Sequence, residues 1–229
     1  IREWCWAAYL VATHTPGISA AQLQRQLGSG SDTTAWHMLH RLRKGMVNET
    51  RSRLSGLIEA DESTIGGPAK GKRGRGVTAA KHKSLVIGAV EVIAYENKQG
   101  TRCERAGRLR LSTVENAGAV NIRDFLSRNV EAGSPVRTDG WPGYFNEALV
   151  GYTHRVRVVR TPERAHQVAP HVHRVFSNLK AWLNGTHHGV EPRYLQRYLD
   201  EFVFRFNRRN TPMAAFQTLL GISTQKAPL

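Results

Sequence analysis

The chain has 229 residues, 40% of them hydrophobic, which is enough for one ordinary core and a small additional domain. It contains 33 Lys and Arg residues against 18 Asp and Glu residues, so its formal net charge is +15. A surface this positive binds polyanions by releasing their counterions, which makes nucleic acid the expected partner. A basic protein of another kind, such as a ribosomal protein, is the alternative.

No stretch approaches the roughly 18 uninterrupted apolar residues of a membrane-spanning helix, so we expect a soluble protein with no membrane partner. The two cysteines, Cys5 and Cys103, lack the spacing of metal ligands, and the expected compartment is a reducing cytoplasm. The sequence begins inside a helical pattern with no initiator Met, so we expect a fragment that lacks upstream sequence.

The first 47 residues have the pattern of a small helical domain. Apolar residues at helical spacing, with Ser19 as an N-cap, predict helices over 2–13, 20–27 and 33–46. A Gly-Ser turn joins the last two, and two short helices joined in this way are typical of a helix-turn-helix. The alternative is a helical hairpin that only packs. The second helix is basic, and the residues expected to contact DNA are His37, Arg41 and Lys44.

After a polar, basic linker at 48–56, a short strand with acidic residues is predicted to begin at Leu57 and to end before Gly66-Gly67. Side chains alternate along a strand, so Glu59 and Asp61 share one face with Leu57. Acidic residues occupy a strand interior only when a cation lies nearby, which predicts a metal-binding carboxylate at the strand end. An exposed edge strand with solvated acids is the alternative.

The next segment, 68–84, is rich in Lys, Arg and Gly and contains no acidic residue. Such a run does not fold on its own. Because it follows the acidic strand directly, we interpret it as a loop that grips a phosphate backbone; a hairpin tip with generic charge is the alternative. The residues expected to contact DNA are Lys70, Lys72, Arg73, Arg75, Lys81 and Lys83.

The rest of the chain alternates between strand and helix patterns. The predicted elements are strands at 85–94, 108–114, 135–139 and 154–159 and helices at 117–130, 171–184 and 193–209. This order matches the ribonuclease H-like architecture, an α/β fold with a mixed five-stranded sheet and flanking helices. We therefore expect a helix-turn-helix domain at 1–47, a ribonuclease H-like catalytic domain at 57–210 and a C-terminal tail at 211–229.

In that architecture the first and fourth strands are neighbours, so Asp61 and Asp139 would lie close together at the middle of the sheet. Two carboxylates this close repel unless a divalent cation lies between them, which predicts a Mg²⁺ or Mn²⁺ site. Pairs of such ions activate water or a 3′-hydroxyl and stabilise the leaving oxygen in phosphoryl transfer. For Asp139-Gly140 the alternative is a simple turn.

A third ligand is expected on the helix after the fifth strand, but no Asp or Glu occurs between Glu163 and Glu191. Imidazole and amide groups also bind divalent ions, so the candidates are His173 and Asn178. His173 and Lys180 are seven residues apart, or two helical turns, and therefore face the same way. Lys180 would hold a phosphate as a point charge. A surface histidine is the alternative for His173.

Long motifs occur at 27–43, 54–67, 138–144, 180–189 and 198–209, the third of which reads Thr-Asp-Gly-Trp-Pro-Gly-Tyr. In these motifs the chain resembles the ISXO-like branch of the bacterial insertion-sequence transposases, in the DDE superfamily. The resemblance implies a bacterial enzyme that transposes double-stranded DNA, either by cut-and-paste or by copying. It also implies two metal ions and a homo-oligomer acting on inverted-repeat ends and a target. Relatives carry a small zinc-binding module upstream.

By this resemblance Asp61 and Asp139 occupy the first two catalytic positions. The superfamily's usual Glu stands seven residues before a basic residue, and counting back from Lys180 gives His173, 34 residues after Asp139. Some members have Asn in the third place, so Asn178 stays open.

The function expected from these observations is that of a DDE-type transposase, a DNA endonuclease and strand transferase. Because the third acid is missing, the alternative is a catalytically impaired, sequence-specific DNA-binding protein derived from such an enzyme. A nuclease that cleaves but does not join ends is a third possibility.

Overall fold

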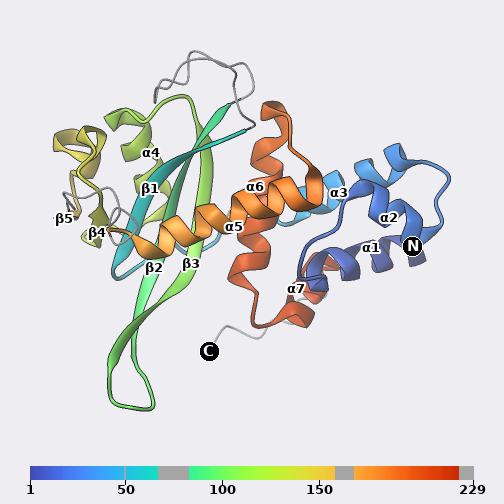
Figure 1. The fold of residues 1–229 in the computed structure, drawn as a ribbon, viewed down its shortest axis with the longest axis horizontal. Coiled ribbons are helices and arrows are strands. Elements are labelled where there is room, and N and C mark those ends of the chain that lie inside the picture. Colours follow the sequence, from blue (N-terminus) through green and yellow to red (C-terminus); the bar gives the residue numbers. More distant parts are fainter. Residues whose placement is uncertain (49, 67–82, 158–167, 222–229) are drawn as a thin grey trace. The chain divides into compact units, whose positions relative to one another are not determined.

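The computed structural model describes residues 1–48, 50–66, 83–157 and 168–221, and the chain forms two compact units (Figure 1). The helical unit comprises residues 1–50, 181–190 and 197–229, and the sheet unit comprises residues 51–180 and 191–196. Within the predicted catalytic domain, residues 181–190 and 197–210 group with the helical unit. Among the described helices, none combines the length and the apolar content that crossing a membrane requires.

The sheet unit is built on one mixed five-stranded sheet with the strand order β3-β2-β1-β4-β5. β1 pairs with β2, and β2 with β3, in antiparallel fashion, whereas the β1–β4 and β4–β5 pairs are parallel. This is the predicted ribonuclease H-like arrangement, in which the first and fourth strands are neighbours. The strands are β1 (Ile58–Ile65), β2 (Ser84–Glu96), β3 (Arg102–Val114), β4 (Pro135–Thr138) and β5 (Thr153–Val156).

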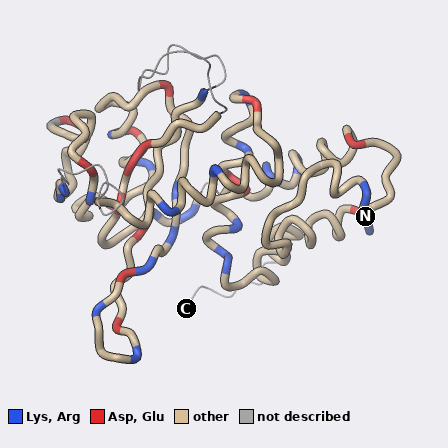
Figure 2. Tube along the Cα trace, viewed as in Figure 1, with Lys and Arg blue, Asp and Glu red and all other residues tan. Residues whose placement is uncertain are grey.

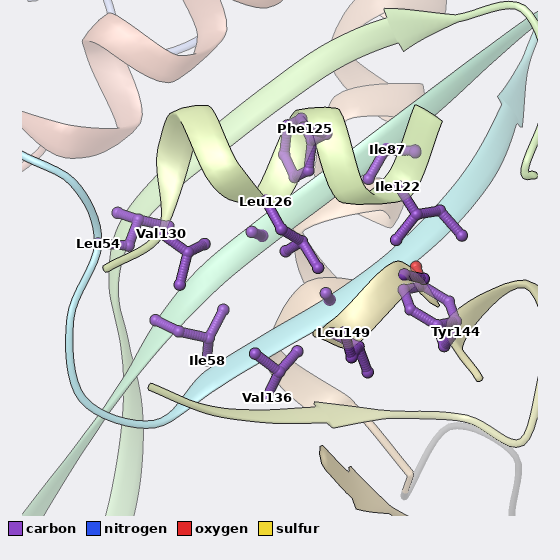
Figure 3. Close-up of a cluster of buried hydrophobic side chains, with 13 residues drawn as sticks. Leu54, Ile58, Ile87, Ile122, Phe125, Leu126, Val130, Val136, Tyr144 and Leu149 are labelled. Carbon is purple, nitrogen blue, oxygen red and sulfur yellow. The ribbon is translucent and has the colours of Figure 1, made fainter. Parts of the chain in front are cut away.

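One face of this sheet is covered by α4 (Ala119–Asn129). Ile122 and Leu126, four residues apart on one side of the helix, pack in a buried cluster with Ile58 of β1 and Val136 of β4 (Figure 3). Because side chains alternate along β1, Ile58 and Ala60 point into this core, whereas Glu59 and Asp61 point to the opposite face.

The opposite face is met by α5 (Pro170–His187), whose first part belongs to the sheet unit. Gly88 of β2 stands opposite Asp61 in the β1–β2 register. A Cβ atom at Gly88 would lie only 3.0 Å from Cζ of Phe176 in α5. The glycine therefore allows the helix to approach the sheet closely beside Asp61.

The helical unit begins with three helices that agree closely with the predicted ones. Ser19 caps the second helix as expected, since its hydroxyl accepts the backbone N–H of Gln22 at 3.2 Å. Gly28 ends that helix in the left-handed region with φ 67°. The second and third helices and the turn between them are compatible with a helix-turn-helix. The three are α1 (Arg2–Thr13), α2 (Ala20–Leu27) and α3 (Asp32–Gly45).

The C-terminal residues complete this unit, which differs from the predicted tail at 211–229. After α6 (Pro192–Asn207), the chain forms a further helix, α7 (Pro212–Leu219), with a proline in its first turn. Ala215 of α7 and Phe204 of α6 are buried in one cluster with apolar residues of α1, α2 and α3. Apolar burial therefore makes this segment part of a core, although it is too short to show a clear helical period.

A buried ion pair links α3 to α6 within the helical unit. Nε of Arg43 lies 2.7 Å from Oε2 of Glu201, and both side chains are 1% exposed. The guanidinium carbon also lies 3.8 Å from the ring centroid of Tyr198. Arg43 belongs to the basic sequence of the predicted recognition helix, but it is a core residue that neutralises a buried acid.

His40 provides a pH test of this core. Its side chain is 3% exposed, and burial, reinforced by the charges of Arg43 and Arg197, lowers its pKa to about 4. The unfolded chain binds a proton near its usual pKa of 6.5, whereas folded His40 stays neutral until about pH 4. The contribution of neutral His40 to the free energy of unfolding should therefore be fully present above pH 6.5 and should be lost as the pH falls towards 4.

Chemical denaturation of the protein on both sides of this pH window measures the effect. The variant His40→Gln should lose part of the pH dependence, while His37→Gln, at an exposed position of the same helix, should retain it. His187, whose pKa is lowered to about 3 by burial, supplies a further part of the dependence. Equal pH dependence in the two variants would contradict the assignment to His40.

Candidate metal centre and DNA-contact residues

Asp61 lies on β1, and Asp139 directly follows β4, the strand that pairs with β1. The parallel register pairs Glu59 of β1 with Arg137 of β4, and each aspartate stands two residues further along the chain. Asp139 directly follows β4, where its Oδ1 accepts the backbone N–H of Trp141 at 3.0 Å. The sequence predicted a carboxylate at the end of this strand. Asp61 instead lies inside β1, because β1 continues beyond the part that pairs with β4.

His173 of α5 contacts the first of these aspartates. Its Nε2 lies 3.0 Å from Oδ2 of Asp61, and the two side chains are 32% and 15% exposed. The hydrogen bond to Asp61 raises the pKa of His173, and burial opposes this effect. The charges of Asp61, Glu59 and Asp139 act in the same direction as the hydrogen bond, so His173 faces a concentration of negative charge.

The same negative charge also affects Tyr144, which is in the core cluster on the α4 side of the sheet. Its side chain is fully buried. Burial raises its pKa well above the usual range, and the carboxylates of Glu62, Asp61 and Asp139 add to the effect. In donor chemistry these residues suit a divalent cation, because Mg²⁺ and Mn²⁺ prefer hard carboxylate oxygens and tolerate an imidazole nitrogen.

The other two candidates on α5 differ in orientation. Asn178 is exposed and five residues after His173, which places it about 140° around the helix from that side chain. Lys180 is exposed and seven residues after His173, only about 20° away around the helix. The helix therefore presents His173 and Lys180 on one side and Asn178 on another, although both His173 and Asn178 were open as third ligands.

A second group of charged residues, not predicted as a site, lies beside the first. Glu59 is fully buried, and its Oε1 accepts from Arg137 at 3.1 Å. Its Oε2 accepts the backbone N–H groups of His171 at 2.7 Å and of Val172 at 3.0 Å. Arg137 also donates to both carboxylate oxygens of Glu104, at 3.0 and 3.1 Å, which lowers the pKa of Glu104.

Ligand atoms of Glu59, Glu104 and His171 lie within 4.8 Å of one another, close enough to surround a metal ion. The guanidinium of Arg137 already pairs with both carboxylates, so we interpret this group as an ion-pair network. The sequence contained a signal for it. An acid at an interior strand position requires a cation nearby, and for Glu59 that cation is an arginine on the neighbouring strand.

The residues predicted to contact DNA from α3 share one exposed side. His37, Arg41 and Lys44 are all exposed and are spaced by four and three residues, which gathers them in one stripe. His40 and Arg43 of the same helix are buried instead. Arrangement on the helix thus divides its basic residues into a solvent-facing set and a core set.

Lys83, which directly precedes β2, is half-buried. The other basic residues predicted in this segment, Lys70, Lys72, Arg73, Arg75 and Lys81, lie outside the described residues. Elsewhere Lys and Arg are distributed along elements of both units (Figure 2). The net charge by itself therefore does not locate a DNA-binding surface.

Three solved structures are similar to this chain at low identity. A simian T-cell lymphotropic virus intasome in complex with PP2A regulatory subunit B56 gamma matches at 13% identity, with a TM-score of 0.38, over 97% of this chain and 75% of that one. A pre-cleavage Mos1 transpososome matches at 12% identity and a TM-score of 0.35, over 93% of this chain and 77% of that one. A Mos1 transposase paired-end complex with the left transposon end matches at 12% identity and a TM-score of 0.31, over 95% and 78% of the two chains.

A search of curated proteins gave no match. The sequence model of the ISXO2-like transposase domain, in contrast, matches residues 53–207, which include β1, β4 and α5 with all three residues of the candidate metal centre. A match over more than half of the chain, on a sheet of the ribonuclease H-like order, establishes the relationship. The chain belongs to the family of ISXO2-like transposase domains.

Proposed function

We propose that this protein is an active transposase that cleaves double-stranded DNA at insertion-sequence ends and joins the ends to a target. The observation that carries the proposal is the contact of His173 in α5 with Asp61 in β1, the strand that pairs with β4, after which Asp139 follows directly. Membership of a transposase family supports action on DNA in general. Two carboxylates and an imidazole would together bind the metal ions that phosphoryl transfer requires.

Asp61, Asp139 and His173 would hold Mg²⁺ or Mn²⁺, as a pair of ions. When bound, these ions activate an attacking hydroxyl and stabilise the charge on the leaving oxygen. The two aspartates contribute the negative charge that attracts the cations, and His173 must be neutral to act as a ligand. Lys180, exposed on the same side of α5 as His173, would hold a DNA phosphate.

The DNA would be held by the exposed stripe of α3 and by the basic segment that follows β1. Joining two ends requires both in one complex, so the working form would be a homo-oligomer on DNA. Cys5 and Cys103 are both free thiols, which suits the reducing bacterial cytoplasm where we place the reaction.

A second function is favoured by one specific observation. The third position of the site carries a histidine and not an acid, and no Asp or Glu lies anywhere between residues 163 and 191. A transposase relative that binds end sequences but no longer cuts them would have such a site. The first experiment below separates the two functions.

Asp139→Asn should abolish nicking of end-sequence DNA in Mg²⁺ or Mn²⁺. The substitution keeps the size of the side chain and an oxygen for the Trp141 amide, but removes the charge that attracts the cation. Retention of DNA in a gel shift should be largely unchanged. Asp124→Asn, at an exposed acid of α4, is the matched control and should nick normally.

Cleavage by Asp139→Asn at the wild-type rate would reject the metal assignment. A wild-type protein that retains end DNA specifically but never nicks it, at any concentration of either metal, would favour the second function.

The identity of the third ligand can be tested by substituting His173 and Asn178 of α5 separately. His173→Ala should abolish nicking, whereas Asn178→Ala should preserve it, because of these two residues His173 is the one that contacts Asp61. His173→Glu should restore nicking to the site, since a carboxylate is a better ligand for a hard cation than imidazole. Loss of nicking in Asn178→Ala with normal nicking in His173→Ala would transfer the role to Asn178.

Arg41 and Arg43 form a matched pair for the DNA-contact proposal. Arg41→Ala should weaken DNA binding and lower the salt dependence of log K by about one unit, with no change in stability. Arg43→Ala should instead cost roughly 3–5 kcal/mol of stability, because it leaves Glu201 buried without its cation. Gel shifts at several salt concentrations and denaturation curves measure the two effects. Identical behaviour of the two variants would contradict the division of α3 into a DNA-facing and a core side.

A further inference from the structure

We infer that Glu59 is a positioning residue for the metal centre: by holding the first amides of α5 it sets His173 against Asp61. The inference rests on the proposed function, because it concerns how the same centre is assembled. It assigns a role to a buried acid that contacts none of the proposed ligands through its own carboxylate.

The carboxylate of Glu59 acts as a cap for a helix to which it does not belong. α5 begins at Pro170, and the first N–H groups of a helix lack partners within the helix. Oε2 of Glu59 accepts two of them, from His171 and Val172, and a negative charge at this end is also favoured by the helix dipole. The start of α5 is thereby fixed to the beginning of β1.

Three residues of the network each lie two positions before a residue of the candidate centre in the sequence. Glu59 precedes Asp61 by two residues, and Arg137, which pairs with Glu59 in the β1–β4 register, precedes Asp139 by two residues. On α5, His171 precedes His173 by the same two residues. Contacts within the network therefore fix the relative positions of β1, β4 and the start of α5, which carry the candidate centre.

Burial makes this arrangement specific. Glu59 is fully buried, and its charge is tolerated only because Arg137 and two amides surround it. If α5 were rotated or shifted by one residue, these amides would leave Oε2 and the buried carboxylate would lose its partners. The favourable position of α5 is the one in which His173 meets Asp61 at 3.0 Å.

Glu104 offers a matched control within the same network. It pairs with the same guanidinium as Glu59, yet its side chain is 38% exposed, and among the described residues its contact with α5 is to the His171 ring, at 3.7 Å, and not to the backbone amides. Removing its charge perturbs Arg137 without touching the amides of α5. A comparison of the two acids therefore separates the capping of α5 from the general stability of the ion-pair network.

The experiment measures binding of Mn²⁺ to the full chain without DNA, by electron paramagnetic resonance of the free ion. Glu59→Gln should weaken Mn²⁺ binding by about 10-fold or more, the scale seen when groups that orient metal ligands are removed. Glu59→Asp keeps the charge but shortens the side chain, so it should also weaken binding. Glu104→Gln should bind Mn²⁺ like the wild type, and Asp139→Asn gives the signal expected for a lost ligand.

Circular dichroism confirms that each variant is folded, and Glu59→Asp decides the matter if Glu59→Gln does not fold. Wild-type affinity in a folded Glu59 variant, or an equal loss in Glu104→Gln, would overturn the positioning role while leaving the metal centre in place. Failure of the wild-type protein itself to bind Mn²⁺ would instead overturn the proposed function, so the two failures are distinguishable.

Discussion

The parallel pairing of β1 with β4 brings together charged residues that are far apart in the sequence. In this register Glu59 and Arg137 form a buried pair, and the two aspartates of the candidate centre occupy the next matching positions. A slip of one residue would turn one aspartate to the face covered by α4, among apolar side chains. The chemistry proposed for this protein therefore depends on the register of a short, two-residue ladder and on the buried charges that specify it.

Each unit contains an ion pair with a buried acid. The arginines of these two pairs reduce the share of the positive charge that can contact DNA. Glu59 is neutralised by Arg137 in the sheet unit, and Glu201 by Arg43 in the helical unit. Replacement of a buried pair by apolar residues is often neutral for stability, whereas loss of one partner is costly. Such pairs specify one arrangement of the elements, and the arginines in them are not available to DNA. Only part of the positive charge therefore belongs to a binding surface.

Local patterns predicted most elements well where a strand or helix has one apolar face. The bounds of α1 and α2 agree with the predicted ones, because the apolar period of α1 and the cap at Ser19 are local features. β3 begins at Arg102 and not at 108, since its first residues pair with the far end of β2 in a hairpin where polar side chains are exposed on both faces. There the partner strand, and not an apolar pattern, maintains the strand.

The sequence by itself determined the ribonuclease H-like order, the two aspartates and the absence of an acid at the third position, because periodicity, residue type and spacing are properties of the chain alone. Only the tertiary structure decided that His173 meets Asp61 and that Asn178 lies on another side of α5. It also decided that Glu59 caps α5, that Arg43 is buried and that α7 joins a core. The physical reason is that these contacts depend on strand register and on the rotation of helices against their neighbours. Both are set by the packing of residues distant in the sequence.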